Sequence, residues 1–222
     1  MIHYHGTPIT PRSELMKMRG RHFCVPFTDG RDLETCLSIG QSIMLDNGAY
    51  SAFTKGIPFD EKGFYEWIDP VLSPIAWAVI PDVIDGSVEQ QREMVSRWPY
   101  RWNLGSPVYH LAEPITRLIE LCDLWPRVCI GSSGRFWNIG TPEWSGRMDE
   151  CFNELSKRHT ILPWIHGLRM LNQTEWPLAS ADSTNTAQNH WIDGCPECLA
   201  GRLDATQPVK KWSEREIQQV LL

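Results

Sequence analysis

The sequence predicts an α/β fold, a single compact (β/α)8 barrel of the TIM type that spans residues 1–222. Eight short apolar runs alternate with amphipathic stretches, and no low-complexity segment or linker divides the chain. Such alternation implies parallel strands joined by right-handed crossovers, and 222 residues suit one barrel of about 200–250 residues. A doubly wound sheet is the alternative, but no phosphate-binding glycine fingerprint follows the first apolar run.

The apolar runs are interpreted as buried strands because they are short and rich in Val, Ile and aromatic residues. In chain order they are "IHYH" (2–5), "HFCVPF" (22–27), "SIMLD" (42–46), "AWAVIPD" (76–82), "SPVYH" (106–110), "RVCIG" (127–131), "ILPWIH" (161–166) and "LASAD" (178–182).

Helix-terminus signals lie between these runs. The stretch "DLETCLSIG" ends on Gly40 as a C-cap, and "SVEQQREMVSRW" opens with Ser87 and Gln90, which can form a capping box. The stretch "PEWSGRMDECFNELSKR" starts with Pro142, which suits a first helical turn. These signals predict three of the barrel's outer helices.

Composition excludes several classes of protein. A hydrophobic content of 42% and a charged content of 22% are typical of a globular chain, and the net charge of −6 alone does not indicate a nucleic-acid partner. No apolar run approaches the roughly 18–20 residues of a membrane span, and "MIHYHGTP" does not resemble a signal peptide. Seven scattered cysteines favour a reduced, cytoplasmic protein.

Polar residues gather at the predicted strand ends, where (β/α)8 barrels carry their chemistry. They are His5, Thr28, Asp29, Asp46, Asn47, Asp82, His110, Gly131, Ser132, Ser133, His166 and Asp182. Several also have a structural interpretation: Asp46 precedes the turn signal Asn47-Gly48, and Asp82 suits a helix cap. Asp182 ends a strand of small residues, where a charge is costly unless it is paired or used.

Two carboxylates across one mouth suit chemistry at a glycosidic carbon, one attacking the carbon and the other transferring a proton. In this interpretation Asp182 is the nucleophile, and Asp46 or a histidine is the acid/base. The predicted catalytic residues are Asp182, Asp46 and His110.

The motifs "MLDNGAYSAF", "IPDVIDG", "PVYHLAEP", "CIGSSG", "WIHGLRML" and "SADSTNTAQN" resemble, in order, strand-end motifs of the tRNA-guanine transglycosylase superfamily. The chain is most similar to short relatives of the 7-deazaguanine DNA transglycosylase type and to related phage and defence-island proteins. The resemblance covers about residues 42–190. It implies a barrel that displaces a base through a covalent intermediate between an aspartate and the sugar.

The resemblance places Asp182 at the nucleophile, Asp46 at the acid/base and Asp82 at the aspartate that reads the base. The remaining base-binding candidates are Gly131, Ser132, His166 and Tyr50. The candidate nucleic-acid-binding residues are Asn185 and Asn189 in the polar run after Asp182, and Arg135, Phe136 and Trp137 in "GSSGRFWN". Aromatic side chains there suit base flipping, which exposes a base for stacking.

The chain departs from the family at two places. His110 replaces a glutamine that reads guanine, and only His190, Cys195 and Cys198 remain where the tRNA enzymes hold zinc. We therefore expect no tRNA-binding zinc subdomain, although these three residues leave open either a zinc clip or a reduced cysteine pair. We expect neither a catalytic metal nor another cofactor.

Together these patterns predict a DNA glycosylase or transglycosylase that flips out a modified base, with excision to an abasic site narrowly favoured over exchange. Phage DNA modification and anti-phage defence are the expected settings. One alternative is a metal-dependent amidohydrolase-type barrel, because "HYH", His110 and Asp182 suit metal ligands. That class also needs a strand-six histidine, where this chain has Gly131 and Ser132. A non-catalytic sensor of modified bases is the other alternative.

Overall fold

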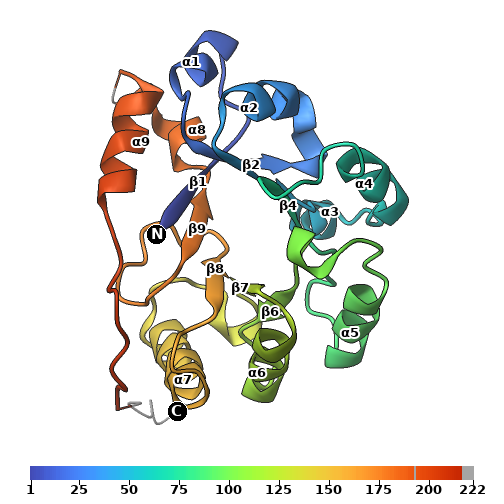
Figure 1. The fold of residues 1–222 in the computed structure, drawn as a ribbon, viewed down its shortest axis with the longest axis vertical. Helices are drawn as coiled ribbons and strands as arrows, with labels where there is room; N and C mark the ends of the chain where they lie inside the picture. The colour runs from blue at the N-terminus through green and yellow to red at the C-terminus, as the bar shows by residue number, and fades with distance from the viewer. Residues whose placement is uncertain (193, 217–222) are drawn as a thin grey trace.

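The computed structural model describes residues 1–192 and 194–216, and it shows a nearly closed barrel of parallel strands surrounded by helices (Figure 1). The strand order is β5-β4-β3-β2-β1-β9-β8-β7-β6. Strands β5 (Gly105–Ser106) and β6 (Val108–His110) flank Pro107, which has no N–H to give to a ladder. Because β5 pairs with β4 and β6 pairs with β7, this interrupted strand joins the two ends of the sheet. The predicted barrel is confirmed.

All eight predicted strands are present. Their bounds are β1 Ile2–Gly6, β2 His22–Pro26, β3 Ser42–Asp46, β4 Ala76–Val79, the β5 and β6 pair, β7 Arg127–Gly131, β8 Trp164–Gly167 and β9 Ser180–Ser183. Two strands are shorter than predicted by two residues or more. Strand β4 stops before Pro81, and β8 begins after Pro163, since proline cannot donate to a parallel ladder.

Helices follow the strands around the barrel. They are α1 Arg12–Lys17, α2 Leu33–Ile39, α3 Ala49–Lys55, α4 Glu61–Ile68, α5 Val88–Ser96, α6 Ile115–Leu124, α7 Pro142–Arg158, α8 Asn185–Asn189 and α9 Pro196–Ala205, with 3-10 turns at Phe27–Asp32, Trp102–Leu104 and Gly134–Phe136. The predicted termini are confirmed: Ser87 and Gln90 form a capping box before α5, Gly40 is the C-cap of α2, and Pro142 begins α7.

The alternation of side chains along each strand separates an inner core from outer ones. The barrel interior is filled by Tyr4, Cys24, Met44, Trp77, Val79, Val108 and Cys129. The neighbours of Met44 in sequence, Ile43 and Leu45, point outward into a core with Phe64 of α4. A third cluster joins β6, β7 and β8 to α6 and α7. Because side chains fill the barrel interior, we expect a ligand to bind at the mouth formed by the strand C-termini.

Candidate active site

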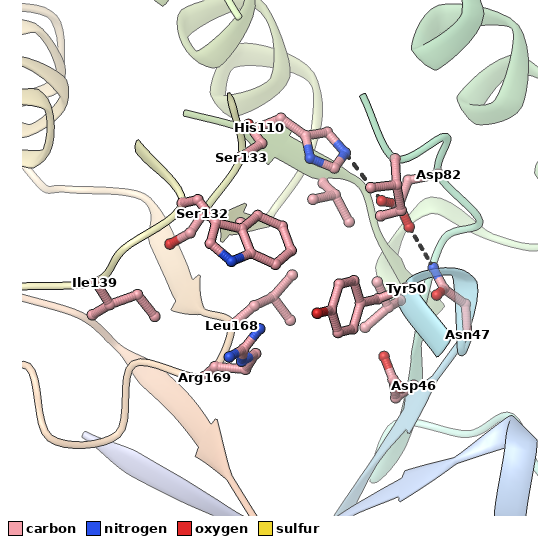
Figure 2. Close-up of a pocket in the computed structure, with 15 residues that line it drawn as sticks. Asp46, Asn47, Tyr50, Asp82, His110, Ser132, Ser133, Ile139, Leu168 and Arg169 are labelled. Carbon is pink, nitrogen blue, oxygen red and sulfur yellow. Dashed lines mark hydrogen bonds and ion pairs between the residues drawn. The ribbon is translucent and has the colours of Figure 1, made fainter. Parts of the chain in front are cut away.

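A pocket opens at the carboxyl ends of β3, β4, β6, β7 and β8, and we call it the mouth pocket (Figure 2). It contains about 620 Å³, its open mouth included. Its lining is Asp46, Asn47, Tyr50, Val79, Asp82, Ile84, Val108, His110, Gly131, Ser132, Ser133, Trp137, Ile139, Leu168 and Arg169. Many of the candidate site residues therefore meet in one place, although they are far apart in the sequence.

Asp82 occupies one wall of this pocket, between His110 and Asn47 (Figure 2). The Asn47 side-chain N–H donates to Asp82 Oδ1 over 2.8 Å and also to the Ile80 carbonyl over 3.0 Å. His110 Nε2 lies 3.0 Å from Asp82 Oδ2, in the geometry of a close ion pair rather than an aligned hydrogen bond. Asp82 is therefore held from both sides, and it pairs with a histidine rather than capping a helix.

His110 carries a raised pKa. Burial opposes the positive charge on its ring, but the carboxylates of Asp82, Glu113 and Asp85 outweigh that penalty. The backbone N–H of His110 also donates to Glu113 Oε2 over 2.9 Å, which fixes the strand end. The wall formed by His110 and Asp82 can therefore present both an N–H donor and a carboxylate acceptor to a ligand.

Asp182 lies at the end of β9 and is 8% exposed. Its Oδ1 accepts the Arg169 backbone N–H over 2.9 Å and contacts His166 Nε2 at 3.2 Å. His166 in turn contacts the Ser180 hydroxyl through Nδ1 at 2.8 Å, so a polar chain orients the carboxylate. Within the part of the chain that the structure describes, both contacts of the Asp182 carboxylate go to Oδ1, and Oδ2 has no hydrogen-bond partner.

Asp46 has the most perturbed carboxyl group of the site. Its pKa is raised to about 7, mainly by burial and further by the negative charges of Asp182 and Asp82, whereas a backbone N–H of Gly48 opposes the shift. These interactions place Asp46 within electrostatic range of both other carboxylates. Asp182 does not line the mouth pocket itself. It lies next to the pocket, because Arg169, which lines the pocket, donates its backbone N–H to Asp182.

Arg169 was not found by sequence reasoning. It has φ +62°, a conformation that costs a residue with a Cβ about 1–2 kcal/mol and that clusters at functional sites. Its guanidinium lies 5.6 Å from the centre of the Tyr50 ring, and it has no ion pair within the described residues. Nothing in "WIHGLRML" signals a left-handed residue at this position, since arginine rarely adopts one.

Aromatic residues border the mouth. Tyr50 and Trp137 are 39% and 38% exposed, and their ring centres lie 5.4 Å apart, which is direct contact. Their neighbour Phe136 is buried in the core with Trp144, so its ring is not presented at the surface, and the Arg135 guanidinium lies 4.7 Å from it. Of the predicted aromatic loop, Trp137 is therefore the residue available for stacking on a ligand.

The other predicted residues lie apart from the pocket or support it. The Asn189 side chain donates to Asn185 Oδ1 over 2.8 Å within α8, and neither lines the mouth pocket. The Ser132 hydroxyl accepts the Trp144 indole N–H over 2.9 Å. Gly131 lies beside Val108 and Leu168, where an added Cβ would be 3.3 Å from a Val108 methyl group, so a small residue keeps this wall open.

Of the described residues considered for metal binding, His110 lines the mouth pocket and the others lie elsewhere. His3 and His5 point out of the barrel, toward Asp204 of α9, at 3.2 and 3.0 Å, which gives the amidohydrolase interpretation no support. Cys195 and Cys198 form a disulfide rather than the expected zinc clip or reduced pair. Across residues 1–192 and 194–216, no three His, Cys, Asp or Glu side chains form a group suited to a metal ion.

Comparison with known proteins gives no relatives: no family model, curated protein or solved structure matches the chain. The resemblance to the transglycosylase superfamily therefore stays a prediction. Among the described residues, no helix is both long and apolar enough to cross a membrane.

Proposed function

We propose that the chain is an enzyme that cleaves the N-glycosidic bond of a nucleotide in DNA, with Asp182 as the nucleophile. The observation that carries this proposal is the carboxylate pair. Asp182 Oδ1 accepts the Arg169 backbone N–H and contacts His166 Nε2 while Oδ2 has no partner among the described residues, whereas the pKa of Asp46 is raised to about 7, mainly by burial. Two carboxyl groups in such different environments suit a division of roles, in which one attacks as the carboxylate and the other donates a proton.

The reaction has two steps. Asp182 Oδ2 attacks C1′ of the flipped nucleotide, the bond from C1′ to the base nitrogen breaks, and Asp46 donates its proton to the departing base. The Asp46 carboxylate then takes a proton from water, whose oxygen attacks C1′ and releases Asp182. An abasic site and a free base result, and a second base in place of water would give exchange instead. His110 is the alternative proton donor.

The base is held in the mouth pocket. Val79, Val108 and Leu168 supply apolar contacts to its faces, while Tyr50 and Trp137 supply aromatic ones. The polar wall described above, a carboxylate acceptor beside an N–H donor, reads the edge of the base. The pocket's mixture of apolar walls and a few polar groups supports a flat heterocycle as the ligand.

The Arg169 guanidinium beside Tyr50 suits a phosphate of the flipped nucleotide, since arginine is preferred for such contacts. DNA is favoured over RNA because the described residues form a short barrel without the zinc subdomain through which the resembling enzymes hold tRNA. Asn185, Asn189 and Arg135 would contact the flanking strand.

The test is Asp182→Asn, which keeps the side chain's shape and removes its nucleophilicity. A panel of oligonucleotides and phage DNAs with different modified bases is incubated with each protein; released bases are scored by mass spectrometry and abasic sites by alkaline cleavage. We expect turnover to fall at least ~10³-fold, roughly 4 kcal/mol of transition-state stabilisation, while DNA binding survives. The matched control is Glu66→Gln, an exposed acid on α4.

Near wild-type release by Asp182→Asn would refute the nucleophile. DNA binding without release of any base, by the wild type as well as by the variant, would refute the enzyme and favour the sensor alternative.

A further inference from the structure

A second pocket lies beside the mouth pocket and shares His110 and Ser133 with it. It contains about 590 Å³, its open mouth included, between the loop after β4 and the loop after β6. Its polar and charged lining residues are Asp85, Ser87, His110, Glu113 and Ser133. Five of the nine residues around this second pocket are polar or charged, and between them lie Gly86, Val88, Ala112 and Pro114. His110 stands between the two.

Glu113 is the strongest indication of a ligand in the second pocket. It is 6% exposed, and its Oε2 accepts the His110 backbone N–H. Its Oε1 is buried and has no hydrogen-bond partner within the described residues. Arg117, the nearest cation along the chain, directs its guanidinium to Glu120 at 2.9 Å instead. A buried acceptor without a partner is rare in native proteins, and here it belongs to a residue that lines the second pocket.

The opposite wall of the second pocket combines acceptors with donors. Asp85 is an exposed carboxylate with φ +55°, a conformation uncommon for a residue other than glycine. Close after it, Ser87 caps the nine-residue helix α5, whose first turn presents backbone N–H groups. An ammonium group only donates hydrogen bonds and a phosphate only accepts them, whereas hydroxyl groups do both. The mixed wall therefore suits hydroxyl groups best.

We propose that the second pocket binds a hydroxyl-rich, sugar-like substituent carried by the base that occupies the mouth pocket. This inference rests on the proposed function, and it specifies the substrate class. A base whose edge meets Asp82 and His110 directs a substituent past the His110 ring into the second pocket. There Glu113 Oε1 and Asp85 accept hydroxyl protons, and the volume accommodates a group of monosaccharide size.

The test measures binding, so that it does not depend on turnover. The probes are single-stranded oligonucleotides with one 5-methylcytosine, one 5-hydroxymethylcytosine or one glucosylated 5-hydroxymethylcytosine, which need no flipping from a duplex. Each is titrated by fluorescence anisotropy into Asp182→Asn, and into the same protein with Glu113→Gln and Asp85→Asn added. Both added substitutions are nearly isosteric. The amide oxygen that Glu113→Gln introduces can still accept the His110 N–H, and asparagine tolerates positive φ well. The control is Glu93→Gln, a 68% exposed acid on α5.

We expect the glucosylated probe to bind at least ten-fold more tightly than the methylated probe. The combined Glu113→Gln and Asp85→Asn variant should reduce this preference to below three-fold, and Glu93→Gln should leave it intact. Equal binding of the three probes, or a preference that the combined variant retains, would overturn the inference even if the wild type releases bases. A lost preference in a protein that releases no base from any probe would support the second pocket and refute the proposed function.

Discussion

The raised pKa of Asp46 predicts that the free energy of unfolding depends on pH. An aspartate titrates near 3.8 in an unfolded chain, whereas Asp46 titrates at about 7 in the folded protein, a difference of about 3 pH units or roughly 4 kcal/mol. Because the folded state binds this proton more tightly, the Asp46 contribution to stability is lost as the pH rises from about 4 to about 7. Asp46→Asn removes this pH dependence and keeps the side chain's shape.

The assay is urea unfolding of the wild type and of Asp46→Asn at pH 5 and pH 8. Between these values the wild type should lose roughly 2–3 kcal/mol of unfolding free energy relative to Asp46→Asn. Glu66→Gln, at an exposed position, should track the wild type at both values. A difference between Asp46→Asn and wild type that is the same at pH 5 and pH 8 would refute the raised pKa.

The geometry of the site also predicts the outcome of four simpler experiments. Turnover by the wild type should fall above pH about 7, roughly ten-fold per pH unit, because Asp46 must be protonated, and a pH–rate profile checks this. Arg169→Gly should be more stable than Arg169→Ala by about 1 kcal/mol, because it relieves the positive φ while both variants lose the guanidinium and bind DNA more weakly. Trp137→Ala should weaken DNA binding by about 1–3 kcal/mol in titrations, whereas Phe136→Ala should lower the free energy of unfolding by about 3–5 kcal/mol. Treatment with EDTA should leave turnover unchanged. A loss of activity with EDTA that zinc restores would instead support a metal-dependent mechanism.

The fold could be predicted because its signals are local. Strands of a buried parallel sheet are apolar on both faces, so short apolar runs such as "SIMLD" and "RVCIG" can be recognised as strands from the sequence. The barrel register then places the strand ends at one mouth, which is how Asp46, Asp82 and His110 were found together. The strand bounds were less accurate near Pro81 and Pro163, where a missing N–H shortens the ladder.

The rest depends on tertiary packing that no local pattern reports. The burial of Phe136 beside an exposed Trp137 is decided by contacts with α7 rather than by the sequence of the loop. The outward orientation of His5 follows from Tyr4 taking the inner face of β1, which could be inferred only once the register was known. The positive φ of Arg169 and the Glu113 Oε1 atom left without a partner among the described residues had no sequence signal at all.

The most direct measurement of the central claim is detection of the covalent intermediate. Wild-type protein is mixed with a substrate oligonucleotide, quenched in acid during turnover and examined on a denaturing gel, and the shifted band is digested for peptide mapping by mass spectrometry. The account predicts a protein–DNA ester whose modified peptide carries the sugar on Asp182, and no such band with Asp182→Asn. Base release without any adduct, or an adduct on another residue, would contradict it.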